Sequence, residues 1–263
     1  MTMSFEDSVG FIWDIDGVVV DSPHEEAWRI TALKPEWGVQ ELSSDFYFMH
    51  VASRPRYEGA DNILRMKGVY ERLGAKTEEE VKQVLDRFCT QKNELIKKLI
   101  QERKFNIFAD AVNLILVSKS KGVRQAAVSA SKNAKDMLKK IDAQTISKSP
   151  KVERGLFKKE DTLHSVFDVD ACGLELKGKE QMIGFTVQKL LEKTRGKLKN
   201  FILFEDAPMA MIAGKKLGMF CIGIQRIGSK ESLLEAGADL VVSDLWDLPY
   251  RELKDRFLEK YPI

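Results

Sequence analysis

Acidic and small polar residues follow buried-looking apolar runs at three separate points of the sequence. These residues are Asp14 and Asp16, Ser129, and Glu205 with Asp206. In open parallel sheets, ligands bind outside the carboxyl ends of the strands, so we expect these side chains to meet at one cleft. A further acid, Asp244, follows the apolar run 240–242 and is expected to lie farther away.

Four carboxylates that share one small volume require a cation. Two carboxylates 4 Å apart repel by about 4 kcal/mol at an effective dielectric constant of 20. The predicted ligands Asp14, Asp16, Glu205 and Asp206 offer only oxygen atoms, without histidine or cysteine nearby. This donor set favours a hard ion, and carboxylates that act together with a substrate phosphate favour Mg²⁺. The substrate is therefore predicted to carry a phosphate group.

A carboxylate pair at this spacing offers a route for phosphoryl transfer. One carboxylate accepts the phosphoryl group as an aspartyl phosphate, which divides a difficult transfer into two easier steps. A second carboxylate two residues on can protonate the leaving oxygen and then deprotonate the acceptor. Such general acid–base catalysis contributes about 10² to 10⁴ in rate.

The elements that position these residues follow from the hydrophobic pattern. The continuous apolar run 9–13, followed by 18–20, is typical of a strand buried on both faces. From about residue 109 helical and strand patterns alternate. The strands are expected at 125–128, 201–204, 219–224 and 240–242, and the helices at 112–121, 133–141 and 209–217. The fold class is therefore α/β, a doubly wound, mainly parallel sheet with helices on both faces.

A helical segment interrupts this alternation after the first strand. Residues 22–102 contain almost no strand-like run, and Thr77 and Glu80 form a capping-box pattern before a long helical period. We therefore predict an all-helical cap domain over residues 22–104, inserted into a core of residues 1–21 and 105–263. The polar, lysine-rich stretch 146–162 is expected to be a solvated loop or a small hairpin.

Composition excludes several classes of protein. The chain has 263 residues, with 42 Lys and Arg against 40 Asp and Glu, so its net charge of +2 gives no reason to expect nucleic acid as a partner. Its 3 cysteines lack the spacing of a disulfide framework or a zinc site. Neither a membrane span nor a signal peptide is indicated. We expect a soluble, cytoplasmic monomer or weak homodimer with a small phosphorylated partner.

The motifs resemble those of the haloacid dehalogenase superfamily. The segment Asp14-Ile15-Asp16-Gly17-Val18-Val19-Val20-Asp21-Ser22 is similar to the family's first motif. Ser129 matches the second motif, Lys179 after Gly178 the third, and Glu205-Asp206 the acidic fourth motif. The resemblance implies that Asp14 is the nucleophile, Asp16 the general acid and base, Ser129 and Lys179 ligands of the phosphate, and the acidic pair metal ligands.

The sequence is similar in particular to β-phosphoglucomutase and its phosphatase relatives. Their phosphate loop resembles Ser129-Ala130-Ser131-Lys132-Asn133, which implies that Ser129, Ala130, Lys132 and Asn133 contact phosphate. In the predicted cap, His24 and Trp28 resemble a hinge histidine and a substrate-facing tryptophan. Arg56, within Arg54-Pro55-Arg56, resembles an arginine that holds a distal phosphate, and Lys92-Asn93 a pair that faces the active site.

Several alternatives remain open at this point. Lys177 lies two residues from Lys179 and is an alternative lysine of the third motif, and the Pro-x-Pro that normally follows this lysine is absent. Each polar residue also has a purely structural interpretation: Ser129 and Asn133 as helix caps, Trp28 as a core residue, Arg56 and Lys92 as parts of a solvated face. The predicted function is Mg²⁺-dependent phosphoryl transfer on a small sugar phosphate, with a mutase, a phosphatase and a non-catalytic phosphate sensor as competing forms.

Overall fold

The computed structural model describes residues 4–52, 54–149, 151–174, 176, 178–226 and 228–262. The chain divides into two compact units. The core unit comprises Met1–Asp21 and Asn106–Ile263, and the cap unit comprises Ser22–Phe105. Phe105, which the sequence placed in the core, belongs to the cap unit.

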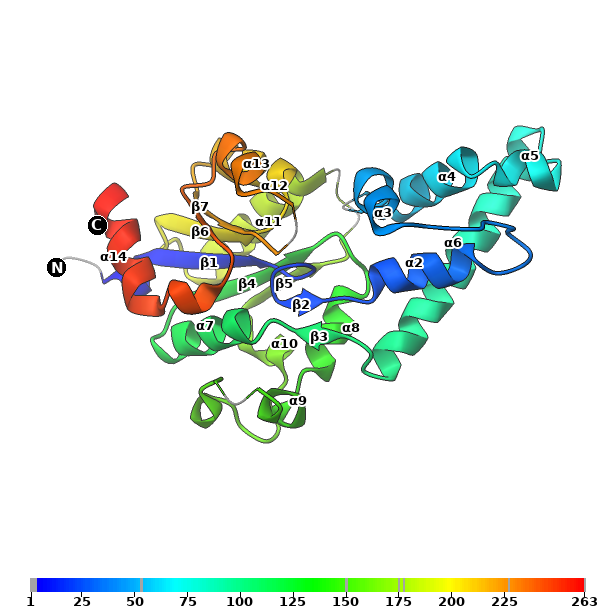
Figure 1. The fold of residues 1–263 in the computed structure, drawn as a ribbon. Coiled ribbons are helices and arrows are strands. Elements are labelled where there is room, and N and C mark those ends of the chain that lie inside the picture. The colour runs from blue at the N-terminus through cyan, green and yellow to red at the C-terminus, as the bar shows by residue number, and fades with distance from the viewer. Residues whose placement is uncertain are drawn as a thin grey trace. The chain divides into compact units, whose positions relative to one another are not determined.

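The core unit is built on a parallel six-stranded sheet with the order β5-β4-β1-β6-β7-β8 (Figure 1). The strands are β1 (Val9–Asp14), β4 (Arg124–Ser129), β5 (Val169–Cys172), β6 (Asn200–Glu205), β7 (Phe220–Ile224) and β8 (Leu240–Val242). The expected strands of the alternating region are present. β5 is an additional strand, which the sequence analysis missed.

Strand β1 is central, and all six of its residues are buried. The ring of Trp13 stacks on Phe204 of β6 with the ring centroids 3.7 Å apart, and its Nε1 donates a hydrogen bond of 2.8 Å to Gln125 Oε1 of β4. The Gln125 amide in turn donates to the carbonyl oxygen of Ile115. The buried polar groups are thus paired, which burial requires, and they join β1 to both neighbouring strands.

Helices cover both faces of this sheet. One face carries α11 (Gly178–Lys193), α12 (Pro208–Lys216) and α13 (Lys230–Glu235), and the other carries α7 (Ala109–Ser120), α10 (Leu163–Val166) and α14 (Tyr250–Lys260) (Figure 1). The short helices α1 (Phe5–Ser8) and α8 (Ala134–Lys140) precede β1 and follow β4. Helix α12 approaches the sheet closely, because a Cβ at Gly214 would lie 2.6 Å from Leu203 Cδ2.

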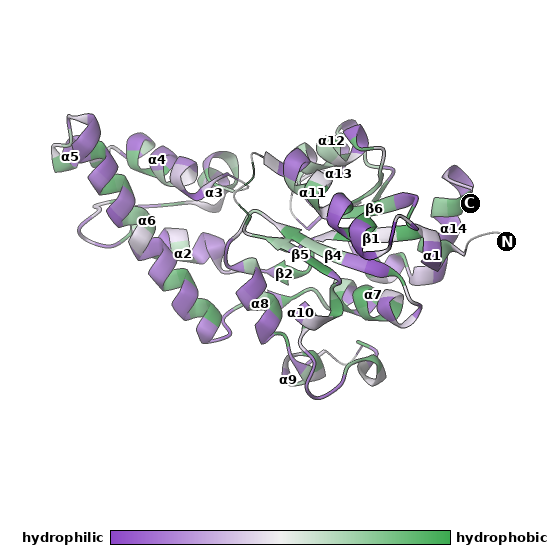
Figure 2. Ribbon diagram, turned by 180° about the vertical axis from the view of Figure 1, so that it is seen from behind, coloured by the Kyte–Doolittle hydropathy of each residue, from purple (hydrophilic) through white to green (hydrophobic). Residues whose placement is uncertain are grey.

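The cap unit is helical, as predicted. Its helices are α2 (His24–Ala32), α3 (Ser44–His50), α4 (Arg56–Met66), α5 (Val69–Leu73) and α6 (Glu78–Gln101). The capping box before α6 is present: Thr77 Oγ1 accepts the backbone N–H of Glu80, and Glu80 Oε2 accepts that of Thr77. Hydrophilic and hydrophobic segments alternate along α6 (Figure 2), as expected for a helix with one buried face.

The chain leaves and re-enters the core unit through two short paired strands. β2 (Val20–Asp21) and β3 (Asn106–Ile107) are antiparallel, with Asp21 opposite Asn106, and Asn106 Nδ2 donates to Asp21 Oδ2 over 3.3 Å. The apolar run 18–20 therefore does not extend the parallel sheet. It forms a turn that brings the chain back toward Ile15, to whose carbonyl oxygen Val19 and Val20 donate.

The stretch 146–162 is largely the exposed, irregular segment that was predicted, with short helical turns at two points. Its described residues include the end of α9 (Ala143–Ser147) and a 3₁₀ turn, Arg154–Leu156, and only an isolated bridge joins Asp142 to Thr162. Asp142 caps α9 by accepting the backbone N–H of Thr145. The apolar side chains of this stretch anchor it, because Ile146, Val152 and Phe157 are buried. Across the described ranges of the chain, no helix has the length and apolarity needed to cross a membrane.

Candidate active site

The three predicted strand ends are neighbours in the sheet. Asp14, Ser129 and Glu205 are the last residues of β1, β4 and β6, and β1 pairs with both other strands. Neighbouring strands lie about 4.8 Å apart, so the three side chains are presented side by side. One carboxylate oxygen each of Asp14, Glu205 and Asp206 lie within 4.8 Å of one another. The sheet thus brings together acids that are 191 or more positions apart in the sequence.

Lys179 places its charge between two of these carboxylates. It is the second residue of α11, and its Nζ donates to Asp14 Oδ1 and, over 2.9 Å, to Glu205 Oε2. This is the geometry expected of the third-motif lysine. The alternative, Lys177, lies outside the described residues.

Burial and neighbouring charges shift the pKa values of Asp14, Asp206 and Lys179. Burial, together with the charge of Glu205, raises the pKa of Asp14 to about 8, although Lys179 opposes that rise. Burial and the charges of Glu205 and Asp14 raise the pKa of Asp206 well above its ordinary value. Burial would lower the pKa of Lys179, but the carboxylates of Asp14 and Glu205 outweigh it and raise that pKa.

The donor set fits a divalent cation. Three carboxylates face one lysine, and burial together with the repulsion between the carboxylates raises the pKa values of Asp14 and Asp206, so their ionised forms are destabilised without a further cation. A bound cation stabilises the ionised carboxylates, and the ligand atoms of this group are all oxygen, as Mg²⁺ prefers.

Asp16 stands apart from the three clustered carboxylates. The clustered group of described residues does not include Asp16, which was predicted to be a fourth carboxylate ligand. Asp16 is half-buried at the start of the turn after β1, and its charge helps to raise the pKa of Asp14. Asp16 therefore lies close enough to influence Asp14 electrostatically but does not join the other carboxylates around one point, and its role as general acid and base stays a prediction.

Gly17 is a functional position whose role the sequence analysis did not identify. Its φ is +91°, and its N–H donates to the carbonyl oxygen of Val20 over 2.9 Å. A Cβ on Gly17 would lie only 2.0 Å from Asp206 Oδ2. A glycine is needed here for two reasons, the left-handed backbone and the close approach of Asp206. The signal in the sequence was the Asp-Gly pair itself.

The segment after β4 forms a tight loop. Ser129 Oγ accepts the backbone N–H of Ser131 over 3.1 Å, and Ser131 Oγ accepts that of Asn133 over 3.2 Å. Ala130 and Lys132 are exposed. Ser129 and Asn133 are buried, with 2% and 3% of their surface exposed.

The side chain of Asn133 does not cap the helix it precedes. Asn133 stands at the N-cap position of α8 but makes no side-chain capping bond. Its Nδ2 has no hydrogen-bond partner among the described residues. A buried N–H donor without an acceptor costs about 1–3 kcal/mol, so this group is the strongest local indication of an absent ligand.

Gly173 supports the same loop from the neighbouring strand. It follows β5, its N–H donates to the carbonyl oxygen of Ser129 over 2.8 Å, and its φ is +71°. A Cβ at Gly173 would lie 2.7 Å from Lys132 Cα. The sequence analysis missed this contact because it missed β5, whose only signal was the alternation of Val169 and Ala171 before a glycine.

Three of the predicted cap residues lie close together within the cap unit. Lys92 is buried on α6, and its Nζ lies 2.7 Å from His24 Nδ1 and 4.7 Å from the centre of the Trp28 ring. Burial, with the charges of Lys92 and Arg56, lowers the pKa of His24 well below its ordinary value. His24 is therefore neutral at neutral pH, and it accepts a hydrogen bond from Lys92.

The structure distinguishes Arg56 from Arg54 and gives Trp28 a packing role. Arg54 forms an ion pair of 2.7 Å with Glu58, whereas Arg56, half-buried at the start of α4, pairs with no carboxylate in the part of the chain that the structure describes. Trp28 is 4% exposed and stacks on Phe88. Its contact with substrate stays a prediction.

Comparison with known proteins places the chain in a family. No sequence-family model matches it. The structure of an archaeal β-phosphoglucomutase from Pyrococcus sp. strain ST 04 is 33% identical in sequence, with a TM-score of 0.75 over 95% of this chain and 98% of that one. The chain belongs to the β-phosphoglucomutase-like subfamily of the haloacid dehalogenase superfamily. The motifs quoted from the sequence therefore identified this subfamily correctly.

Two further comparisons agree with that assignment. A β-phosphoglucomutase from Clostridium difficile is 24% identical over 95% of this chain and 97% of that one, with a TM-score of 0.68, and shows the same fold. Two 2-deoxyglucose-6-phosphate phosphatases of Saccharomyces cerevisiae are 47% identical over 45 residues. That match spans 17% of this chain and 18% of each yeast protein.

Proposed function

We propose that this member of the β-phosphoglucomutase-like subfamily transfers phosphoryl groups to and from a sugar phosphate through an aspartyl phosphate on Asp14. The observation that carries the proposal is the contact of Asp14 with Lys179 inside a group of buried carboxylates, beside a loop with an unpaired buried donor. Carboxylates that are grouped together and shielded from water destabilise a fold, so packing alone does not explain this group.

The residues divide the chemistry between them. A carboxylate oxygen of Asp14 attacks phosphorus in line, a new O–P bond forms, and the bond from phosphorus to the leaving oxygen breaks. Asp16 gives a proton to that leaving oxygen and then removes one from the acceptor hydroxyl. Lys179, Ser129 and Asn133 donate to the phosphate oxygens, where charge gathers in the transition state.

A magnesium ion would be held by Asp14 and Asp206, with Glu205 oriented by its bond to Lys179. When bound, the ion neutralises charge on the phosphate and on the attacking carboxylate. Lys179 keeps one positive charge next to Asp14 regardless of the metal, which lowers the repulsion between the nucleophile and an anionic phosphate.

Within the cap unit, two cationic side chains suit an anionic ligand. Arg56 and Lys92 are cationic and influence the same histidine, His24. Arg56 has no carboxylate partner among the described residues, so its guanidinium suits a second phosphate group. This arrangement supports a substrate or intermediate that carries two phosphates, which a mutase needs and a phosphatase does not.

The first candidate is accordingly a mutase acting on β-glucose 1-phosphate. It is supported by the 33% identity to an archaeal β-phosphoglucomutase over nearly the full length of both chains. The second candidate is a sugar-phosphate phosphatase. It is supported by the 45-residue match to the yeast 2-deoxyglucose-6-phosphate phosphatases.

One experiment separates the two candidates from each other and from a non-catalytic sensor. The protein is incubated with Mg²⁺, β-glucose 1-phosphate and a trace of β-glucose 1,6-bisphosphate, and both glucose 6-phosphate and free phosphate are measured. Glucose 6-phosphate in excess of free phosphate supports the mutase, and free phosphate alone supports the phosphatase. Binding without either product, with the Asp14→Asn variant behaving identically, contradicts the proposed enzymatic function.

A further inference from the structure

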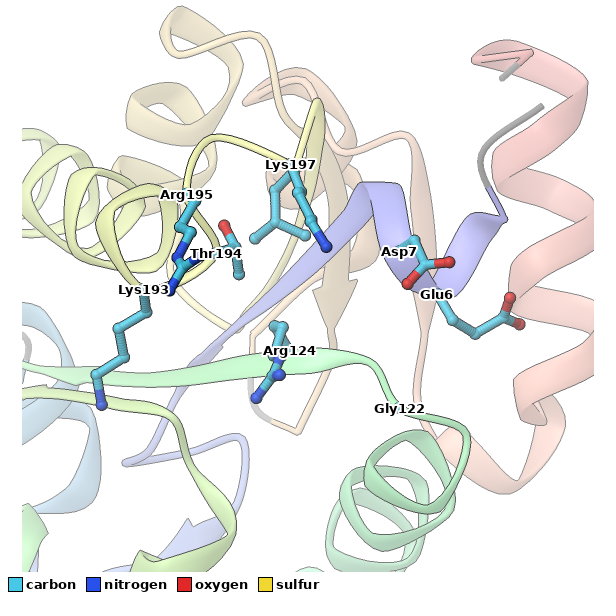
Figure 3. A pocket seen from close by; sticks show the side chains of 9 residues that line it. Glu6, Asp7, Gly122, Arg124, Lys193, Thr194, Arg195 and Lys197 are labelled. Atoms are coloured by element: carbon cyan, nitrogen blue, oxygen red, sulfur yellow. The ribbon is translucent and has the colours of Figure 1, made fainter. Parts of the chain in front are cut away.

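A cavity, which we name the basal pocket, lies near the amino ends of β4 and β6. It has a volume of about 280 Å³. It is lined by Glu6, Asp7, Gly122, Arg124, Lys193, Thr194, Arg195, Lys197 and Leu198 (Figure 3). All of these residues belong to the core unit.

The basal pocket is separate from the candidate active site. Arg124 is the first residue of β4 and Ser129 is the last. At about 3.3 Å per residue, the five steps between them correspond to about 16 Å. A ligand in the basal pocket therefore cannot be the phosphate that Asp14 receives.

The lining of the basal pocket is rich in cations from two elements. Arg124 comes from β4, and Lys193, Arg195 and Lys197 come from the end of α11 and the turn that follows it (Figure 3). The acids of the lining, Glu6 and Asp7, come from α1 on the other side. The net charge of the pocket depends on which of these charged side chains already pair with a group of opposite charge.

The acids are largely engaged elsewhere. Glu6 Oε1 accepts from Lys254 Nζ and from the hydroxyl of Tyr250, each over 2.8 Å. Asp7 Oδ2 accepts from the hydroxyl of Ser4 over 2.9 Å. Neither acid forms an ion pair with a cation of the basal pocket in the described part of the chain.

The cations are only partly neutralised. Arg124 forms an ion pair of 2.9 Å with Asp168, which is shared with Lys119. Lys193 Nζ donates to the backbone carbonyl oxygen of Asp168, and this neutral group does not compensate the charge of the lysine. Arg195 and Lys197 make no ion pair with any described carboxylate. Among the described residues, the pocket therefore presents three positive charges without a carboxylate partner, at Lys193, Arg195 and Lys197, against one negative charge without a cationic partner, at Asp7.

Arg195 lies in the turn that ends α11. Its φ is +53°, in the left-handed region that glycine and asparagine adopt at lower cost than arginine. The following Gly196 has a φ of +72°. The N–H of Gly196 donates to the carbonyl oxygen of Leu191 over 2.9 Å, which is the hydrogen bond that ends a helix with a left-handed residue, so this turn fixes where the Arg195 side chain leaves the backbone.

We propose that the basal pocket binds a small anion that carries a phosphate group. Arg195 and Lys197 hold its oxygens, and Arg124 and Lys193 add positive potential. A guanidinium fork beside lysine ammonium groups matches phosphate better than a single carboxylate. The volume of about 280 Å³ lies just below the range of about 300–1,000 Å³ for small-molecule sites, which favours inorganic phosphate, pyrophosphate or a small phosphorylated metabolite over a larger ligand.

The test follows backbone amide resonances by NMR while the full-length protein is titrated with inorganic phosphate and then with pyrophosphate, against sodium chloride at matched ionic strength. We expect saturable shifts at Gly122 and at residues 194–198, resolved from any shifts at residues 129–133. These two groups of signals report the basal pocket and the active site separately. The proposal therefore stands or falls independently of the proposed catalytic function.

Two double variants decide the assignment. Arg195→Asn with Lys197→Gln removes two charges from the pocket, and asparagine tolerates the positive φ, so the fold is kept. Lys121→Gln with Lys199→Gln removes two charges from exposed residues that do not line it. We expect the first variant to weaken the saturable shifts at residues 194–198 at least tenfold and the second to weaken them less than twofold.

Three outcomes overturn the proposal. One is a phosphate response that is linear up to the highest concentration or is matched by chloride. Another is equal weakening in both double variants, which means that general surface charge is responsible. The third is an unchanged affinity in Lys197→Gln alone, a conservative variant at an exposed site that keeps the test valid if the double variant fails to fold.

Discussion

Replacing Gly17 by alanine tests whether the position of Asp206 matters to phosphoryl transfer. The added Cβ would lie 2.0 Å from Asp206 Oδ2, whereas ordinary contact begins at 3.4 Å. The carboxylate or the turn must therefore shift by about 1.4 Å, since 3.4 − 2.0 = 1.4. A displacement of about 1 Å at a reacting group can cost about 10² in rate, which corresponds to about 2.7 kcal/mol.

The matched control separates this displacement from backbone strain. Gly218 has a φ of +73°, and a Cβ there would meet nothing within 4 Å. Both substitutions place alanine in the left-handed region, at a cost of about 1–2 kcal/mol in unfolding free energy. Only Gly17→Ala also displaces Asp206.

The assay is release of phosphate from an aryl phosphate at saturating Mg²⁺, well below the unfolding temperature of both variants. We expect Gly17→Ala to lose about 10² in kcat, and Gly218→Ala to stay within threefold of the natural protein. Equal activities of the two variants would refute the reasoning, because Asp206 would then be free to move without consequence.

Three further predictions concern charge and hydrogen bonding. Lys179→Met leaves Asp14 and Glu205 without their buried cation, so we expect the unfolding free energy without Mg²⁺ to fall by about 3–5 kcal/mol in urea titrations. Added Mg²⁺ should restore part of this loss. An unchanged unfolding free energy would contradict the ion pairs. Asn133→Ala removes a buried donor whose lack of a partner costs about 1–3 kcal/mol, so the unfolding free energy should not fall, while KM for the phosphate substrate should rise about 10-fold or more. A large destabilisation without a change in KM would assign Asn133 to packing. Burial would raise the pKa of Asp170, but hydrogen bonds from the backbone N–H of Cys172 and from His164 and Lys135 lower it from 3.8 to about 2. Because the pKa is lower in the folded state, this carboxylate stabilises the fold above about pH 4 and loses its contribution between pH 4 and 2. In urea titrations, Asp170→Asn should therefore cost about 2 kcal/mol at pH 7 and progressively less below pH 4. A difference that does not depend on pH would contradict the shift.

The sequence predicted the parts of the site that lie at strand ends. Continuous apolar runs located β1, β4 and β6, and the rule for parallel sheets then placed Asp14, Ser129 and Glu205 at one edge. Strand order was not part of that prediction. The sheet places β1 between β4 and β6, which is why these three ends are immediate neighbours and why Asp244, after the edge strand β8, is not among them.

Other features depend on contacts that no local pattern encodes. Four carboxylates were predicted to cluster, but among the described residues the cluster holds three. The fourth, Asp16, lies in the turn after β1, where the next residue is a glycine in the left-handed region. The caps of two helices also differ in a way that residue type alone does not predict. Thr77 caps α6 as its pattern indicated, but the side chain of Asn133, which has an equally suitable residue type, leaves its donor unpaired within the described structure.

The stretch 146–162 shows what composition leaves out, because its lysines are exposed as expected but its anchoring residues were not identified. Its many lysines suggested solvent exposure, yet three apolar residues are buried and a capping aspartate starts a helix just before it. Charged side chains can extend into water while their neighbours in the sequence pack inward, so an average over the stretch conceals the anchoring residues.

The paired residues Asp21 and Asn106 have a consequence for how such a protein can change. Opposed residues in an antiparallel pair lie about 5 Å apart, so the core itself fixes both attachment points of the 84-residue insertion, residues 22–105. An insertion that begins and ends at one spot can be lengthened, shortened or exchanged without stretching the sheet, because closing the loop depends only weakly on its length. Selection can thus alter the inserted helical unit while the sheet and the residues at its strand ends stay unchanged.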